Sequence, residues 1–402
     1  QNLVFGPRGG ALYYWSQPGV TVDRAVAVSS LPGASDVPLT QNLILVSDVS
    51  RFTIVFGTND IGSSDVEPML VRWSDQESLT NWTPAITNQA GSILLSPGSA
   101  IIAATQNRQE ILIWTDSALY SMQYLGPPFV WGINPLMSNL SIISPNAVAT
   151  VNNTAYWMGA DKFYYYDGRV NTLNCDLREY IYSNINQSQA EQCFAGTNEG
   201  FNEIWFFYPS ANSETVDSYV VYNYLEKIWY FGSLARTAWL DSGLRPYPLA
   251  ATYVNNIVNH ESGVDDGSVD PAVPINSYIT SSQFDIGDGD RFAFIWRMLP
   301  DLTFRGSTAA NPSVTMYLQP EQNSGSGYTT PASVAGPDSN ASAAVTGTVV
   351  PATATQIDQY TGQVYIRVRG RQMSIKVVNN TLGTQWQLGS PRIDIRPDGR
   401  RA

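Results

Sequence analysis

The sequence predicts an all-β protein, in which a β-propeller is followed by a small β-sandwich-like module. Apolar and aromatic runs of a few residues are bounded by Gly, Asn and Pro, which is the pattern of short strands joined by tight turns. The chain of 402 residues contains 31 Gly and 24 Pro, and 12% of its residues are aromatic. Units of several strands follow one another at intervals that are typical of propeller blades. A chain of this length can bury a large core.

Residues 1–40 are rich in Gly and Pro and contain one aromatic cluster at residues 13–15. We expect an extended, loop-rich leading segment here. Residue 1 is Gln rather than Met, so we also expect that an N-terminal portion precedes this sequence.

The propeller is expected over residues 41–262. Its units begin near positions 43, 101, 147 and 192, and a spacing of roughly 45–58 residues fits one blade per unit. The second to fourth units each carry a Trp in or near their second strand, namely Trp114, Trp157 and Trp205. Residues 192–231 show the pattern of one four-stranded blade, with strands at 193–195, 204–208, 218–222 and 228–231. A weaker fifth unit is expected over 238–260.

The acidic, turn-rich residues 263–275 are predicted to be a linker, and residues 276–402 a β-sandwich-like module. Within this module, residues 321–355 are dominated by Ser, Gly, Ala, Thr and Pro, so we expect a mobile loop. Val364, Ile366 and Val368 alternate with Tyr365, Arg367 and Arg369, which predicts a half-buried strand.

Charge is unevenly distributed along the chain. Residues 363–402 contain eight Arg or Lys and two Asp, whereas the other 362 residues contain 14 basic and 32 acidic groups, a net charge of −18. One interpretation is a solvated surface whose Arg–Asp pairs contribute little. The other is an interface that grips carboxylates of an acidic neighbour, which includes another copy of the chain. The candidate interface residues are Arg367, Arg369, Arg371, Arg392, Arg396, Arg400 and Arg401.

The sequence offers little that catalysis requires. His260 is the only histidine, which rules out a multi-histidine metal site and leaves one candidate base, with Glu261 beside it. A turn residue or a pH-sensitive contact are the other interpretations of His260. The nucleophile motif G-x-S-x-G is absent, and no carboxylate pair stands out from alternatives such as Asp75/Glu77 or Asp265/Asp266. We expect no enzymatic activity and no cofactor.

Asp285, Asp288 and Asp290 lie in a Gly-rich turn and form a weak candidate for Ca²⁺, although the same residues suit a plain hairpin turn. Cys175 and Cys193 are the only cysteines, so the fold does not depend on a disulfide framework. They either pair with each other or are two buried thiols. No apolar run is long enough for a transmembrane helix, and we expect no membrane insertion.

Several longer segments carry a family resemblance. They are residues 72–84 (RWSDQESLTNWTP), 110–129 (EILIWTDSALYSMQYLGPPF), 155–170 (AYWMGADKFYYYDGRV), 219–241, 285–292 (DIGDGDRF) and 369–401. Together they resemble the tail nozzle, or tail tubular protein B-like, virion proteins of short-tailed bacteriophages. The resemblance is spread over nearly the whole chain.

This resemblance implies a structural subunit of the virion tail that is assembled in the host cytoplasm. About six copies would form a closed ring that extends the DNA channel, retains the packaged genome and releases it during infection. The implied partners are other copies of the chain, the tail adaptor, other tail proteins and fibres. Double-stranded DNA would pass without sequence-specific binding, because an acidic lining repels phosphates and no basic stripe interleaves with aromatic residues.

The alternative function is a receptor- or carbohydrate-binding propeller on the virion surface. Exposed aromatic side chains on blade loops would favour it, because aromatic faces stack on sugars. Trp131, Trp239 and the run of Tyr164, Tyr165 and Tyr166 are the candidates, and the propeller core is the other location in which these side chains could lie.

Overall fold

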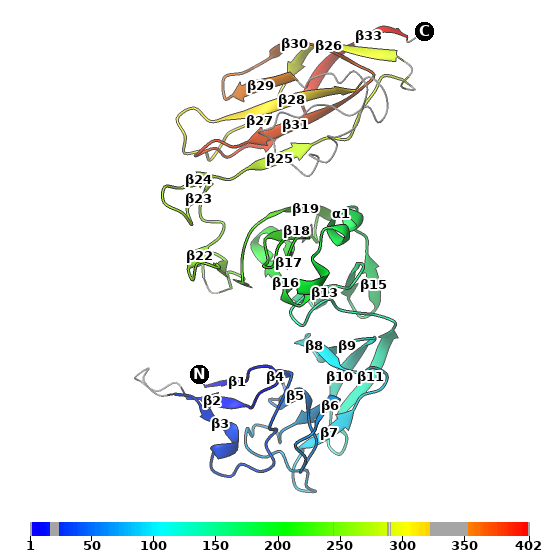
Figure 1. Ribbon diagram of the computed structural model, residues 1–402, viewed down its shortest axis with the longest axis vertical. Helices are drawn as coiled ribbons and strands as arrows, with labels where there is room; N and C mark the ends of the chain where they lie inside the picture. Colours follow the sequence, from blue (N-terminus) through cyan, green and yellow to red (C-terminus); the bar gives the residue numbers. More distant parts are fainter. Residues whose placement is uncertain are drawn as a thin grey trace. The chain divides into compact units, whose positions relative to one another are not determined.

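The computed structural model describes residues 2–16, 24–243, 245–287, 289, 291–321 and 353–400. The chain divides into two compact units, unit 1 over Gln1–Glu261 and unit 2 over Ser262–Ala402. Antiparallel strands dominate both units (Figure 1). The prediction of an all-β protein is therefore confirmed.

Unit 1 contains six antiparallel sheets in the part of the chain that the structure describes, and each is built from consecutive strands. The first comprises β1 (Leu3–Phe5), β2 (Tyr13–Trp15) and β3 (Val26–Ala27). The second comprises β4 (Leu43–Val46), β5 (Thr53–Asn59), β6 (Val66–Trp73) and β7 (Gly91–Leu94), and the third β8 (Ile101–Gln106), β9 (Glu110–Thr115), β10 (Ala118–Gly126) and β11 (Val130–Ser138).

The fourth sheet comprises β12 (Val148–Val151), β13 (Thr154–Met158), β14 (Phe163–Tyr166) and β15 (Val170–Leu173). The fifth comprises β16 (Phe194–Asn198), β17 (Glu203–Tyr208), β18 (Ser218–Asn223) and β19 (Ile228–Ser233), and the sixth β20 (Ala238–Leu240), β21 (Leu249–Ala251) and β22 (Ile257–Asn259). Short helices lie between strands: η1 (Val28–Ser30), α1 (Arg178–Ser183), η2 (Gln187–Gln192) and η3 (Glu199–Phe201).

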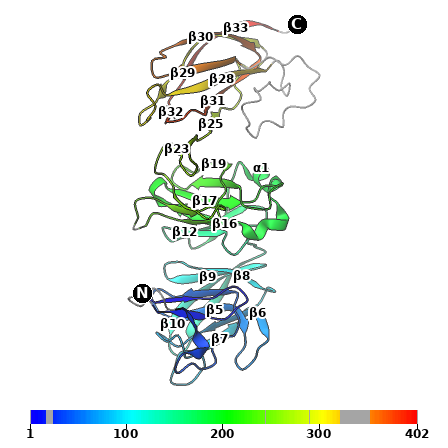
Figure 2. The ribbon, with the colours of Figure 1, turned by 60° about the vertical axis from the view of Figure 1, so that its left-hand side comes forward.

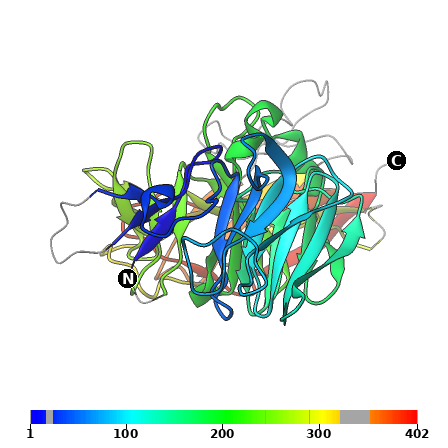
Figure 3. The same ribbon diagram turned by 90° about the horizontal axis from the view of Figure 1, so that it is seen from below.

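The sheets of unit 1 follow one another around an arc, with the first strand of each sheet toward the inside and the last toward the outside (Figure 1). Contacts between first strands link the second sheet to the third (β4 with β8), the fourth to the fifth (β12 with β16) and the fifth to the sixth (β16 with β20). Seen from below, the strands of the second and third sheets run side by side (Figure 3). This is the arrangement of propeller blades.

Hydrophobic clusters fill the spaces between consecutive sheets of unit 1. Val28 and Val55 join the first sheet to the second, and Phe56 and Ile113 join the second to the third. A larger cluster runs through the third, fourth and fifth sheets, where the rings of Trp114 and Trp157 meet edge to face at 5.3 Å. A single sheet leaves an apolar face bare, so each blade is stabilised mainly by its neighbours.

Four blade starts agree with the sequence prediction, since β4, β8, β12 and β16 begin at residues 43, 101, 148 and 194. The leading segment differs from its prediction. Residues 1–40 contribute the sheet β1–β3, whose strands of two or three residues are too short to give a periodic signal. The α-helix Arg178–Ser183 was not predicted either, because six residues span less than two helical turns.

Unit 2 is a sandwich of two sheets (Figure 2). One sheet has the order β25 (Ser277–Thr280), β31 (Gln372–Asn379), β28 (Ser313–Glu321) and β29 (Thr353–Asp358). The other has the order β30 (Val364–Gly370), β26 (Arg291–Leu299) and β33 (Arg392–Arg400). Two small pairs complete the unit, β23 (Asp265–Asp266) with β24 (Val273–Pro274) and β27 (Leu302–Thr303) with β32 (Gln387–Leu388).

The core of unit 2 lies between these two sheets. It contains Ile295, Ile366 and Val368 from one sheet and Met316 and Val377 from the other. The tract 263–275, which was expected to be a linker, belongs to unit 2: the Asp265 carboxylate accepts the backbone N–H of Gly383 at 2.8 Å. Most of the predicted loop 321–355 lies outside the described residues, and its two ends belong to β28 and β29.

Candidate interaction surface

Strand β30 gives unit 2 one face directed to the core and one directed outward. Ile366 and Val368 are buried in the sandwich core, whereas Tyr365, Arg367 and Arg369 are exposed. This confirms the alternation predicted from the sequence. Three long polar or amphipathic side chains therefore stand in a row on the outer surface of the sheet.

The neighbouring strand β26 adds aromatic side chains to the same face. Ala293, Ile295 and Met298 face the core. The register with both neighbouring strands shifts between Ile295 and Arg297. A β-bulge of this kind places two successive residues on one side of a sheet. Trp296 and Arg297 are both brought to the outer face in this way.

Arginine side chains cover these aromatic rings. The guanidinium carbons of Arg297 and Arg396 each lie 5.1 Å from the centre of the Trp296 ring. The guanidinium carbon of Arg369 lies 4.2 Å from the centre of the Phe292 ring. Such contacts contribute about 0.5–1 kcal/mol at exposed sites. They hold the guanidinium groups close to the outer surface of the sheet.

Two ion pairs cross the face. Arg297 Nε donates to Asp394 Oδ2 at 2.6 Å, and Arg369 Nε donates to Asp398 Oδ2 at 2.5 Å. The Arg297–Asp394 side chains are 35% and 36% exposed, and the Arg369–Asp398 side chains 52% and 50%. Water screens pairs this exposed, so each contributes only about 0–1 kcal/mol to stability. We call this outer surface of β30, β26 and β33 the arginine face.

The seven predicted interface arginines do not share one location. Arg367, Arg369, Arg392 and Arg396 lie on strands of the arginine face. Arg371 instead donates a hydrogen bond from Nε to the backbone carbonyl of Gly289, beside the turn that joins β30 to β31. The side chain of Arg400 and the whole of Arg401 lie outside the described residues.

Sequence reasoning missed Trp296, Arg297 and Phe292. The run Arg291–Leu299 is almost wholly apolar, so it resembles a strand buried on both sides, and the bulge that turns Arg297 outward leaves no sequence signal. The expectation that no basic stripe interleaves with aromatic residues holds along the chain but not in the fold, where β26 and β33 bring Trp296 next to Arg396.

The face carries a net positive charge. Among the described side chains of its strands, five arginines (Arg297, Arg367, Arg369, Arg392 and Arg396) stand against two carboxylates, Asp394 and Asp398. Among the described residues, Arg367, Arg392 and Arg396 make no ion pair with a carboxylate. By contrast, unit 1 contains 11 Arg or Lys and 22 Asp or Glu, a net charge of −11.

His260 lies in a polar cluster of unit 1. Arg236 Nε donates to His260 Nε2 at 3.0 Å, and the imidazole lies against Trp239 with ring centres 4.8 Å apart. The buried Glu203 nearby accepts hydrogen bonds from Asn198, Trp205 and Tyr230. Burial, followed by the hydrogen bond to Glu203, raises the pKa of Tyr230. The hydrogen bond from Arg236 and the contact with Trp239 make His260 part of the packing of unit 1.

Cys175 and Cys193 are free thiols. Burial raises the pKa of each thiol to about 12, so both remain protonated and unreactive at neutral pH. Asp288 and Asp290 of the weak Ca²⁺ candidate lie outside the described residues. In the described ranges, no group of three or more His, Cys, Asp or Glu side chains is arranged to hold a metal ion.

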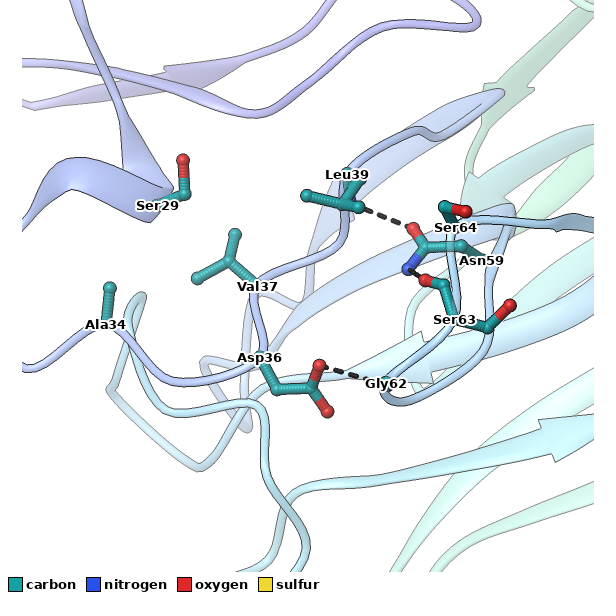
Figure 4. A pocket seen from close by; sticks show the side chains of 9 residues that line it. All are labelled: Ser29, Ala34, Asp36, Val37, Leu39, Asn59, Gly62, Ser63 and Ser64. Atoms are coloured by element: carbon teal, nitrogen blue, oxygen red, sulfur yellow. Dashed lines mark hydrogen bonds between the residues drawn. The ribbon is translucent and has the colours of Figure 1, made fainter.

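A recess of about 460 Å³ opens beside the first and second sheets (Figure 4). Its polar walls hold the backbone in place: Asn59 Oδ1 accepts the N–H of Leu39 at 2.8 Å, and Asp36 Oδ1 accepts the N–H of Gly62 at 3.2 Å. These side chains fix loops, and no pair of catalytic groups faces the recess.

The aromatic candidates for sugar binding lie mostly inside unit 1. Trp131, Tyr164 and Tyr166 are buried, and Trp239 stacks on Trp205 at 5.1 Å. One aromatic pair at the surface is Trp296 with Tyr365, whose ring centres are 6.4 Å apart on the arginine face. Tyr365 is 67% exposed. No helix in the described part of the chain is both long and apolar enough to cross a membrane.

No protein-family model and no curated protein matches the chain. Among solved structures, it is similar to the AfRom2 CNH domain at 12% identity and a TM-score of 0.36, covering 64% of this chain and 81% of that one. It is also similar to the extracellular domain of the putative one component system BT4673 from B. thetaiotaomicron, at 9% identity and a TM-score of 0.38, covering 98% of this chain and 55% of that one. Similarities this low do not indicate a function.

Proposed function

We propose that this protein is a structural component of a short phage tail, which assembles into a ring around the DNA channel. The observation that carries the proposal is the separation of charge between a positive arginine face on unit 2 and an acidic unit 1 of net charge −11. The resemblance to tail nozzle proteins supplies the biological setting.

The arginine face has the composition of a protein interface. Trp, Tyr and Arg are the residues most often found at binding hot spots. Guanidinium groups such as those of Arg367 and Arg396 can form paired hydrogen bonds with carboxylates, for which an acidic unit 1 of a second copy is a suitable source. Because a contact between unlike surfaces of two identical chains repeats, it closes into a ring when the rotation between copies allows.

The acidic charge also suits a channel for DNA. Each phosphate that a protein neutralises adds salt-dependent affinity for DNA, which would slow passage. The chain has only three Lys, and its net charge is −12. A ring of such subunits would hold or release DNA by movement of loops or blades, without catalysis.

The test is the solution mass of the full chain by light scattering at low and high salt. We expect a large species at low salt that dissociates at high salt, because salt screens attraction between exposed charges. The variant R367E/R396E should remain monomeric even at low salt. The control R108E/R169E reverses two arginines of unit 1 and should assemble. Equal assembly of all three proteins would contradict the proposed role of the arginine face.

Receptor or carbohydrate binding remains the second candidate, and the exposed Trp296–Tyr365 pair favours it. This function predicts that W296A/Y365A abolishes binding to a glycan array or to host cells. A wild-type monomer that binds glycans through this pair would replace the ring proposal.

A further inference from the structure

The hairpin β10–β11 ends in an exposed apolar tip. Strand β10 pairs with β9 only as far as Gln123, opposite Glu110, but it continues to pair with β11 as far as Gly126, opposite Val130. Three residues of the hairpin therefore extend beyond the rest of the sheet, a projection of about 10 Å at 3.3 Å per residue. At this tip Leu125 is 60% exposed and Phe129 is 76% exposed.

The hairpin is anchored firmly at its base. The rings of Tyr124 and Trp131 lie 5.5 Å from each other, and both lie 5.5 Å from the buried ring of Phe52. The Tyr124 hydroxyl also donates to Gln89 Oε1 at 3.0 Å. An anchored tip loses little conformational entropy on binding, which favours affinity.

The backbone of the tip is held in an unfavourable conformation. Val130 has φ of 57°, in a region that β-branched residues avoid. Strain of this kind persists only where the surrounding structure enforces it, and it occurs most often at functional sites. A turn that only connects two strands requires neither this strain nor an exposed Phe129.

The hairpin also lies in the middle of a stretch without charge. No Asp, Glu, Lys, Arg or His occurs between Ser117 and Ala160, in a chain of which 14% of residues are charged. Another exposed apolar pair, Leu225 and Phe201, is instead flanked by Glu199, Glu226 and Lys227. The sequence on either side of these exposed apolar side chains thus lacks charge, and depletion of charged residues is typical of the centre of a protein interface.

We propose that the β10–β11 hairpin docks on a second copy of this chain. The proposed ring supplies the occupant, a second copy of the chain: two chains of net charge −12 repel each other, so a contact between them is least opposed where the sequence carries no charge. This inference rests on the proposed ring and adds a second contact to it, one that depends on burial of Leu125 and Phe129 rather than on salt-sensitive ion pairs.

The experiment compares the solution mass of three full-length proteins over a concentration series: wild type, L125S/F129S, and the matched control L225S/F201S. The control removes the same two side-chain types, at similar exposure, from a charged surface. Its two positions are neighbours, because the Asn223 side chain hydrogen-bonds to both the Phe201 carbonyl and the Leu225 N–H. We expect L125S/F129S to weaken self-association at least about tenfold and the control to behave as wild type. Rings that form equally well from all three proteins would overturn the inference and leave the ring proposal intact.

A photo-crosslinking side chain at position 129, such as benzoylphenylalanine, gives a readout that does not depend on the polar variant folding. Its capture of a second copy of the chain is the expected result. If the wild type stays monomeric but this crosslink forms, the ring proposal fails and the inference stands. The inference is wrong if no crosslinked dimer forms. It is also wrong if, when phosphatidylcholine vesicles are added, the probe crosslinks only to lipid.

Discussion

Arg72 is a buried charge that ties loops of unit 1 to the second sheet. Its side chain is 1% exposed, and it donates to the backbone carbonyls of Asn59 at 3.0 Å and Asp36 at 2.7 Å. The Asp36 carboxylate lies 3.6 Å away. Burial lowers the pKa of Arg72, and the charges of Asp36 and Asp60 oppose that shift. The guanidinium thus supplies the hydrogen bonds that the Asn59 and Asp36 carbonyls would otherwise make with water.

Replacing this side chain should destabilise unit 1 strongly. We expect R72M to lower the free energy of unfolding by about 3 kcal/mol, because it leaves buried carbonyls and a carboxylate without their partner. The measurement is urea unfolding of unit 1. The control R51M removes an exposed ion pair with Glu77, whose side chains are 69% and 63% exposed, and should cost less than about 1 kcal/mol. Equal losses in the two variants would contradict this role of Arg72.

Glu321 is a buried carboxyl of unit 2, 4% exposed, which accepts a hydrogen bond from Gln283 at 2.6 Å. Burial raises its pKa above the ordinary value of 4.5. The folded state therefore binds this proton more tightly than the unfolded state does. The stability that results is fully present below pH 4.5 and is lost as the pH rises through the folded-state pKa.

The variant E321Q removes this titration while keeping the hydrogen-bond acceptor. We expect the stability of E321Q relative to wild type to increase as the pH rises from 4 to 7. Chemical unfolding of unit 2 at a series of pH values measures the difference. Parallel stability curves for the two proteins would show that Glu321 does not titrate differently in the folded state.

At the scale of elements, Trp239 makes a close packing contact between the sixth and fifth sheets of unit 1. Trp239 of β20 donates from Nε1 to the Thr197 carbonyl at 2.8 Å and stacks on Trp205. Gly196 of β16 makes room for it, because a Cβ at this position would lie 2.5 Å from Trp239 Cδ1. The absence of a side chain at Gly196 therefore allows Trp239 to pack this closely on the fifth sheet.

Adding a methyl group here should loosen the sixth sheet. We expect G196A to cost about 1–3 kcal/mol through overpacking and to speed hydrogen exchange in β20–β22. The control G200A adds a methyl group nearby. The nearest atom to its added Cβ is 4.0 Å away, so hydrogen exchange in β20–β22 should not change. Unchanged protection of β20–β22 in G196A would show that Trp239 does not hold this sheet.

Elements were predictable from sequence where their pattern is local. The alternation in β30 identified the exposed Tyr365, Arg367 and Arg369, and the Trp-containing strands marked the blades. The arginine face was only half predictable, because Arg297 and Asp394 are 97 residues apart and meet through strand pairing. The sheet β1–β3 was missed because its strands are too short to show a period.

At the scale of the whole molecule, the chain combines a propeller-like unit, whose blades stabilise one another, with a sandwich that carries an Arg- and Trp-rich face. Each unit has its own core. In the proposed ring, the arginine face and the β10–β11 hairpin would provide two different kinds of contact, one sensitive to salt and the other not. A ring built on both contacts would associate more weakly at high salt, and its subunits would still meet in one relative orientation.

Electron microscopy of the purified full-length protein at low salt tests the central claim most directly. We expect closed rings of about six subunits with an open centre, and their absence in R367E/R396E. Particles that are monomers at every concentration, or open filaments without closure, would contradict it.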